Sequence, residues 1–433
     1  MIASEEVRDH PEHVIRAGGG DDIPVLKLGV IYGANASGKS NLVKAMLMAR
    51  DMILDPQDVG SRIVRAPFKL DPACRDMPTR FEFEIQIDNR YFAYGFSVSA
   101  ERVEEEWLFE VGRTIENRVF ERNGGQFEWG DWLGLLDHEK VSFLKSNAKG
   151  THSTRLFLTD CRERNLHDTV PEIADILAVI RWFEDGLIVT LPDWFYRSIP
   201  VRLQSDELFK QEMSRYLRCF DTGIETVDVE PMDPSSRELE RTFPGSGYFS
   251  GLLAAQGTFD GSNEFTARDE QGVLRTWRLV SRHLGQTETE PRATFEMSEE
   301  SDGTRRLMQL VPAMIAMMEG GGVFVIDELD RSLHADILHS YLANFLKYST
   351  GRSSQLIVTT HDTTLLRQDF LRHDEVWFVE KGKDQSSRLV ALEEYKDVDQ
   401  SKDLQQDYLL GRFGGVPVIR DFSWLGEKHG ETA

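Results

Sequence analysis

The stretch from Gly33 to Ser40 combines glycines, a lysine and hydroxyls at the spacing that binds a nucleotide phosphate. Its residues, with the asparagine that follows, are Gly33, Ala34, Asn35, Ala36, Ser37, Gly38, Lys39, Ser40 and Asn41. The two glycines let the backbone approach a phosphate closely, and successive N–H groups at a helix start attract an anion. Lys39 can reach the β- and γ-phosphates, and the Ser40 hydroxyl can hold Mg²⁺. This P-loop pattern predicts a nucleotide site with a Mg²⁺ ion.

An acidic pair, Asp327 and Glu328, directly follows the apolar run 323–326. In a P-loop protein, an aspartate at the end of a buried strand holds Mg²⁺ through water, and a glutamate beside it orients and polarises the attacking water. An acidic pair on its own is more often a surface pair. The apolar run before it favours a Walker B element, with Asp327 at the metal and Glu328 catalytic.

Three further groups stand in sequence order with these two. Ser301, Gly303 and Thr304 begin a helix, where hydroxyls and N–H groups can bind an anion, although such a start is by itself usually a helix cap. Asp330 follows the acidic pair directly. His361 ends another apolar run, and an imidazole at the carboxyl end of a parallel strand is well placed to contact a γ-phosphate.

The elements that position these groups alternate between apolar runs and helical patterns, which predicts a parallel sheet covered by helices. We expect buried strands at 28–32, 323–326, 356–360 and 376–379, and helices after the P-loop and at 305–318, 333–346 and from 397 onward. Residues 411–417 are expected to close the fold.

Between the P-loop helix and residue 290 the pattern differs. Alternating apolar residues predict a hairpin of 81–87 and 92–98 around Asp88-Asn89, and a second of 119–122 and 127–129 around a glycine turn. Residues 130–225 favour helices, among them 170–183 and 206–220, followed by a short strand within 221–229 and a mobile loop at 231–270.

The predicted fold class is therefore α/β: a P-loop ATPase head with a mixed sheet, an antiparallel β subdomain and a helical insertion. We expect an N-terminal lobe over 1–100 with the P-loop and antiparallel strands, the insertion over 101–290, and a C-terminal lobe over 291–433 that holds Ser301, Asp327, Asp330 and His361.

Composition narrows the class of protein. The chain of 433 residues is 40% apolar, has no apolar run of membrane-spanning length and no signal-peptide pattern, and its three cysteines lack paired spacing. These features favour a cytoplasmic protein. The net charge of −23 argues against non-specific coating of nucleic acid. Two arginine trios could still form a local basic groove, although each is more often a solvated surface: Arg275, Arg278 and Arg282, and Arg155, Arg162 and Arg164.

The order of these motifs resembles the ABC-type ATPase head. That resemblance implies that Ser301, Gly303 and Thr304 form the signature motif, which contacts ATP held by the P-loop of a second subunit. It implies that Asp330 is the D-loop residue and His361 the switch histidine. Two ATP molecules would lie in a head-to-tail pair, so the active unit would be at least a homodimer. A Q-loop glutamine has no clear position, with Gln86 as a possibility on an exposed strand face.

Within that class, the chain looks similar to prokaryotic AAA/ABC-like ATPases of phage-defence operons: the RloA type, the ATPase subunit of PARIS, and the ATPase half of overcoming-lysogenization-defect nucleases. The stretches that carry this likeness are IYGANASGKSN (31–41), ESDGTRRL (300–307) and YLLGRFGGVP (408–417). Such heads usually begin with a strand ahead of the first loop, so we expect a trimmed start or a missing edge strand. We expect no C-terminal Toprim nuclease in this chain.

The resemblance implies a sensor ATPase of antiviral defence, in the manner of abortive infection or toxin–antitoxin systems. It would assemble on ATP and control a separate nuclease or toxin of the same operon, with a nucleic acid or phage protein as trigger. The alternative is a RecF-like, DNA-engaging repair ATPase without a toxin partner. A transporter ATPase fits less well, because those proteins usually carry a Leu-Ser-Gly-Gly-Gln signature. A nuclease fits less well still, because no second carboxylate cluster with metal spacing is visible.

Overall fold

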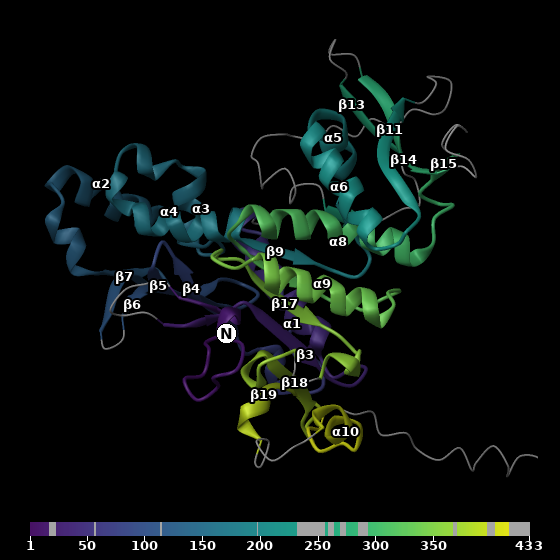
Figure 1. Cartoon of the computed structure of the whole chain (residues 1–433). Helices are drawn as coiled ribbons and strands as arrows, with labels where there is room; N and C mark the ends of the chain where they lie inside the picture. Colours follow the sequence, from purple (N-terminus) through teal and green to yellow (C-terminus); the bar gives the residue numbers. More distant parts are fainter. Residues whose placement is uncertain are drawn as a thin grey trace, which may run out of the picture.

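The structure is a computed structural model of the whole chain (Figure 1). It describes residues 1–16, 23–55, 58–112, 115–196, 198–231, 256–258, 264–268, 274–284, 293–366, 370–395 and 403–414.

A six-stranded mixed sheet forms the centre of the molecule, with strand order β19-β18-β3-β17-β16-β9. Its strands are β3 (Leu28–Tyr32), β9 (Leu187–Thr190), β16 (Val323–Ile326), β17 (Gln355–Thr359), β18 (Val376–Lys381) and β19 (Ser387–Ala391). Neighbouring strands are parallel except that β19 pairs antiparallel with β18. The four strands predicted from apolar runs are all confirmed. β9 and β19 were not predicted.

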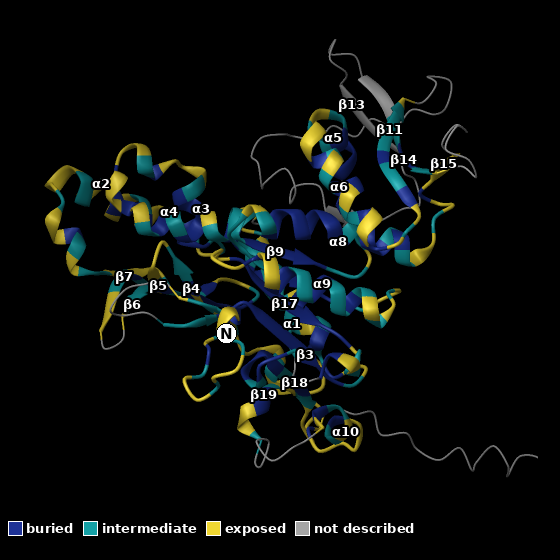
Figure 2. Cartoon of the chain, viewed as in Figure 1, coloured by how far each residue is buried: buried dark blue, intermediate teal, exposed yellow. Residues whose placement is uncertain are grey.

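Helices cover both faces of this sheet, and alternate strand residues enter two separate cores. Val30 and Tyr32 of β3 face α8 (Asp302–Glu319) and α9 (Ala335–Tyr348), whereas Ile31 faces α1 (Lys39–Leu54) and α4 (Ala174–Arg181). The burial of β3 and β17 on both faces is visible in Figure 2. This arrangement explains why these strands read as continuous apolar runs instead of alternating ones.

A five-stranded antiparallel sheet of order β4-β5-β6-β7-β8 follows the P-loop helix. Its strands are β4 (Thr79–Ile87), β5 (Arg90–Val98), β6 (Val103–Val111), β7 (Glu116–Asn123) and β8 (Gln126–Trp129). Asp88 and Asn89 both have positive φ, 48° and 64°, as a two-residue hairpin turn of type I′ requires. Both predicted hairpins are therefore confirmed. β6 was missed because three successive glutamates interrupt its alternation.

The helical insertion is confirmed in outline. Its helices are α2 (His138–Gly150), α3 (Phe157–Glu163), α4, α5 (Ser198–Ser205) and α6 (Glu207–Cys219). The short strand predicted within 221–229 is β11 (Ile224–Pro231), which pairs with β14 (Leu274–His283), and β14 also pairs with β13 (Glu264–Arg268) and β15 (Ala293–Glu296).

The loop predicted at 231–270 lies mostly outside the described residues. Where the structure describes it, the prediction was wrong, because β12 (Gln256–Thr258) and β13 are strands. β12 pairs with residues 194–196, which are distant in sequence, and β13 pairs with β14, the next strand along the chain.

The two terminal regions pack near the P-loop strand. At the N-terminal side, β1 (Val14–Ile15) pairs with β2 (Val25–Leu26). Of the tail predicted to be helical, the structure describes α10 (Leu404–Leu409), whose Tyr408 packs against Tyr32 and Phe378. The predicted closing segment lies outside the described residues from position 415 onward. Within the described part of the chain, every helix falls short of the length or apolarity needed to cross a membrane.

Candidate nucleotide-binding site

The P-loop joins the end of β3 to the start of α1, and its glycines fit where no side chain could. A Cβ on Gly33 would lie 2.6 Å from Ser37 Oγ and 2.9 Å from the carbonyl oxygen of Val379. Gly38 caps α1 with φ 114°, and a Cβ there would lie 2.3 Å from the hydroxyl of Ser387 on β19. Ser387 also donates a 2.5 Å hydrogen bond to Ser37 O. The loop is therefore held from both sides by β18 and β19.

Lys39 is folded back onto its own loop. Its Nζ donates to Gly33 O at 2.7 Å and to Ala34 O at 3.3 Å, and the side chain is almost fully buried. Burial lowers the pKa of the Lys39 ammonium, and the carboxylates of Asp327 and its neighbours oppose that shift. Because β17 pairs in parallel with both β3 and β16, the segments that carry Lys39 and these carboxylates follow adjacent strand ends at the same edge of the sheet.

The other predicted loop residues surround the same anion-binding turn. Ala36 has φ 62°, and Asn35, Ala36 and Asn41 are exposed. Ser40 is half-buried in the first turn of α1. Ser37 is buried, and its hydroxyl has no partner within the described chain. An unpaired buried hydroxyl costs free energy unless a ligand satisfies it, which fits a bound phosphate.

Asp327 and Glu328 are positioned by a threonine on the neighbouring strand. Thr359 Oγ1 donates to Asp327 Oδ1 at 2.6 Å and accepts from Glu328 N at 2.8 Å. Asp327 is 1% exposed, whereas Glu328 is half-buried and has φ 48°. A positive φ is uncommon for a residue other than glycine, so the turn after β16 is held by its surroundings. Thr359 has no motif spacing that would have revealed it in the sequence.

Asp330 and His361 meet at the same edge of the sheet. Asp330 Oδ2 accepts from His361 N at 3.2 Å, and Asp330 Oδ1 is buried without a partner among the described residues. Partial desolvation and then repulsion from Lys39 lower the pKa of the exposed His361 imidazole. Both causes favour the neutral form of the ring. Parallel pairing and the bonds of Thr359 and Asp330 thus bring together, at the carboxyl ends of β3, β16 and β17, the segments that carry Lys39, Asp327, Glu328, Asp330 and His361.

Arg306 on α8 donates hydrogen bonds to the turn after β16. The sequence patterns did not predict this role. Its Nη2 donates to Asp327 O at 3.1 Å and to Glu328 O at 3.0 Å, and its Nη1 donates to Gln309 Oε1 at 3.2 Å and to Pro192 O at 3.4 Å. The side chain is 4% exposed, and burial lowers the pKa of its guanidinium. A rigid planar donor fork suits two adjacent carbonyls. Arg306 therefore links α8 to the turn after β16.

The predicted signature residues lie at the start of α8. Ser301 caps the helix, accepting from Thr304 N at 3.1 Å, and its hydroxyl lies 2.9 Å from Thr304 Oγ1. A Cβ on Gly303 would lie 2.9 Å from Ser332 O, in the turn that follows Asp330. The described contacts thus connect this motif to the D-loop, and not to the P-loop of the same chain.

Gln86, the possible Q-loop residue, lies on β4. Its amide donates to Tyr91 Oη at 3.4 Å, and Tyr91 in turn contacts the backbone of Ile23. Among the described residues, no contact joins Gln86 to the P-loop.

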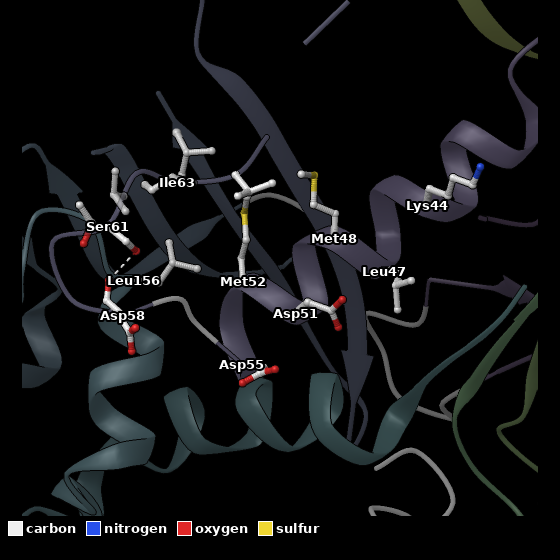
Figure 3. A pocket seen from close by; sticks show the side chains of 14 residues that line it. Lys44, Leu47, Met48, Asp51, Met52, Asp55, Asp58, Ser61, Ile63 and Leu156 are labelled. Carbon is white, nitrogen blue, oxygen red and sulfur yellow. Dashed lines mark hydrogen bonds between the residues drawn. The ribbon is translucent and has the colours of Figure 1, made fainter. Parts of the chain in front are cut away.

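A separate cavity of about 330 Å³ lies along the second half of α1. Figure 3 shows Met48 and Met52 on its wall with Asp51 and Asp55 beside them, and Asp58 lies on the loop opposite. Burial raises the pKa of Asp51. Three carboxylates oppose the binding of a phosphate, so this cavity does not compete with the P-loop as a nucleotide site.

Comparison with known proteins identifies the family. Residues 28–367 match the sequence model of the family described as "AAA domain, putative AbiEii toxin, Type IV TA system". The match spans the P-loop, the Walker B strand and His361. No curated protein gives a significant match.

Solved structures of SMC head domains are similar at low identity. An SMC head bound to the C-winged helix domain of ScpA has 16% identity and a TM-score of 0.39, covering 86% of this chain and 91% of that one. The SMC head of Thermotoga maritima has 14% identity and a TM-score of 0.32, covering 86% and 94%. The head from Pyrococcus furiosus, bound to the C-terminal domain of ScpA, has 13% identity and a TM-score of 0.35, covering 88% and 97%.

The family model covers most of the chain, and the mixed sheet carries a P-loop and a Walker B pair at adjacent strand ends. The chain therefore belongs to this AAA-domain family and has the fold of an AAA/ABC-type P-loop ATPase.

Proposed function

We propose that the protein binds and hydrolyses ATP, assembles with a second copy on ATP, and acts as a sensor and scaffold for a separate nuclease or toxin in phage defence. The observation that carries the ATPase proposal is that the segments holding Lys39, the Asp327–Glu328 pair and His361 follow adjacent parallel strands at one sheet edge. The toxin–antitoxin wording of the family description supports the defence context.

Each residue of the site has a proposed role. The loop N–H groups, Lys39 and the exposed side chains of Asn35 and Asn41 surround the phosphates, and Lys39 exchanges its loop carbonyls for them. Ser40 and Asp327 would hold Mg²⁺, directly and through water, and the ion would neutralise charge on the phosphates. Glu328 orients and polarises the attacking water.

His361 is proposed to contact the γ-phosphate as a neutral donor. Its backbone is fixed by Asp330, so the D-loop and the histidine respond to nucleotide as one unit.

The signature motif is proposed to complete the site of a partner copy. Gly303 lies against Ser332 of its own chain, Ser301 caps the helix through Thr304 N, and the N–H groups at this helix start could bind an anion. A head-to-tail pair would supply each such helix start with the ATP on the other copy's P-loop. Hydrolysis would then require at least a dimer.

The RecF-like alternative gains no support from the described arginines. Arg278 pairs with Glu296 at 2.7 Å, and Arg282 pairs with Asp228 and Glu230 at 3.3 Å. Arg162 likewise pairs with Glu184 at 2.9 Å. Neighbouring carboxylates neutralise these guanidinium groups, which leaves less positive charge for a nucleic-acid backbone.

The experiment that tests the proposal is the mass of Glu328→Gln with and without ATP-Mg²⁺, alone and with the product of the neighbouring gene. We expect ATP to produce a dimer or larger ring that retains the neighbour, because the variant binds ATP without hydrolysing it. Lys39→Ala is the matched control and should stay in its ATP-free state. A Glu328→Gln protein that remains monomeric with bound ATP would contradict the composite site, and full-rate hydrolysis would contradict the role of Glu328.

A further inference from the structure

We propose that His10, Glu12 and His13 form a binding site for a transition-metal ion of the Zn²⁺ class, independent of the nucleotide site. The three residues lie in and just before η1 (Pro11–His13), in the segment that precedes β1. Two imidazoles and one carboxylate are a ligand set that Zn²⁺ takes in proteins, with a water completing the coordination.

The separations between the three ligand atoms are already close to those that a tetrahedral ion requires. His10 Nδ1 is 3.3 Å from Glu12 Oε1, and His13 Nε2 is 3.8 Å from the same oxygen. Tetrahedral Zn²⁺ with bonds of about 2.0–2.2 Å places its ligand atoms about 3.3–3.6 Å apart. All three atoms lie within 4.8 Å of one another, so the widest pair closes by about 1 Å to bind an ion. Rotation of the partly exposed His10 ring supplies that movement.

The second ring nitrogen of His13 is held as a metal ligand requires. His13 Nδ1 lies 3.0 and 3.2 Å from the two carboxylate oxygens of Glu375, which is fully buried. Glu375 Oε2 is itself fixed by Arg372 N at 2.9 Å. A carboxylate on Nδ1 keeps the proton there and turns the Nε2 lone pair outward, toward Glu12. Metal-bound histidines almost always have such a partner on the other nitrogen.

This candidate metal site lies where the N-terminal segment packs against the residues that precede β18. Arg372 Nη1 donates to Asp9 O at 2.6 Å, and Asp374 accepts from Ser4 N at 2.8 Å, so the N-terminal segment is fastened to the residues that lead into β18. β18 lies beside β3, the P-loop strand. A bound ion would stabilise the packing of the N-terminal segment against these residues without contacting the nucleotide.

The test measures Zn²⁺ binding to the tag-free full chain by calorimetry in excess Mg²⁺, which occupies oxygen-ligand sites such as the Walker B pair. We expect one Zn²⁺ per chain, an increase in melting temperature with Zn²⁺, and a Co²⁺ absorption band of tetrahedral intensity. His10→Gln and Glu12→Gln, both at partly exposed positions, should each weaken Zn²⁺ binding by about tenfold or more, and Glu375→Gln by about ten- to a hundredfold.

The matched control is His167→Gln, which removes an exposed histidine next to Asp168 and should leave Zn²⁺ binding unchanged. Retention of one tight Zn²⁺ in His10→Gln or Glu12→Gln, or binding no tighter than the His10→Gln background, would overturn the proposal. Lys39→Ala should keep the Zn²⁺ site, so a failure of the ATPase proposal remains distinguishable from a failure here.

Discussion

At the scale of single residues, one hydroxyl sets the geometry of both Walker B acids. Thr359 Oγ1 donates to Asp327 and accepts from Glu328 N, and Thr359 is fully buried. Removing that hydroxyl leaves a buried carboxylate oxygen and a backbone N–H without a partner. A buried polar group that loses its hydrogen-bond partner has a desolvation penalty of about 1–3 kcal/mol.

We therefore predict that Thr359→Val, which has nearly the same shape, lowers the hydrolysis rate by about 5- to 150-fold, which is the rate change that 1–3 kcal/mol implies. Nucleotide affinity should change little, because the P-loop is untouched. Single-turnover hydrolysis and a fluorescent-nucleotide titration measure the two quantities. Thr359→Ser keeps the hydroxyl and should keep most of the rate. Equal rates for Val and Ser would contradict the role of the hydroxyl.

His361 gives a pH dependence of known sign. Its pKa is lowered in the folded state, so the folded protein binds fewer protons than the unfolded chain just below the usual histidine pKa. Stability from this group is present above about pH 6.5 and is lost as the pH falls through the unfolded value. We expect His361→Asn to reduce the loss of stability between pH 7.5 and 5.5, measured by urea unfolding. An equal loss in both proteins would contradict the lowered pKa.

At the scale of elements, α8 does more than cover the sheet. It begins with the proposed signature motif and, one turn later, places Arg306 on the carbonyls of Asp327 and Glu328. A shift of the helix start is therefore transmitted to the turn that carries the proposed catalytic glutamate. This makes Arg306 a positioning residue between the two motifs.

We predict that Arg306→Met lowers kcat far more than it changes the KM for ATP, since Glu328 loses its support while the P-loop remains. Arg306→Lys should recover part of the rate, because one ammonium can reach one of the two carbonyls. Arg305→Met is the matched control, because Arg305 pairs with Asp302 at the surface. A fall in melting temperature with unchanged kcat would show that Arg306 only stabilises the fold.

Sequence patterns predicted the elements that carry strong periodicity and missed those that do not. β16 was predicted with its bounds, because four apolar residues stand directly before two acids. β9 is just as short, and it was missed although Glu184, Asp185 and Gly186 separate it from the helical pattern of 170–183, because its pairing with the distant β16 leaves no local pattern. The division into parts at residues 100 and 290 remains a proposal.

The candidate nucleotide-binding site was likewise predicted only where its residues follow a local sequence motif. Motif residues such as Lys39 and Asp327 have spacings fixed by the phosphate and the ion, so a sequence reveals them. Thr359, Arg306 and Ser387 act through hydrogen bonds to residues 21 to 350 positions away. Only tertiary pairing determines such contacts, and no local pattern encodes them.

At the scale of the whole molecule, net charge influences which binding partners the protein can associate with. The net charge of −23 and the ion-paired arginines favour a basic partner over nucleic acid, and two copies of this chain repel each other at long range. A partner drawn by this charge should associate more slowly as ionic strength rises. Assembly through the proposed ATP contacts instead depends on nucleotide. Measuring association at several salt concentrations, with and without ATP, therefore distinguishes partner binding driven by charge from assembly driven by ATP.

The position of β3 has a consequence for synthesis on the ribosome. Both of its neighbours, β17 and β18, come from residues 355–381, and the hydroxyl that supports the P-loop comes from Ser387. Until that late part of the chain emerges, the strand that ends in the P-loop has no partner on either edge. The proposed ATP site therefore cannot be complete in a nascent chain until the residues up to Ser387 have left the ribosome.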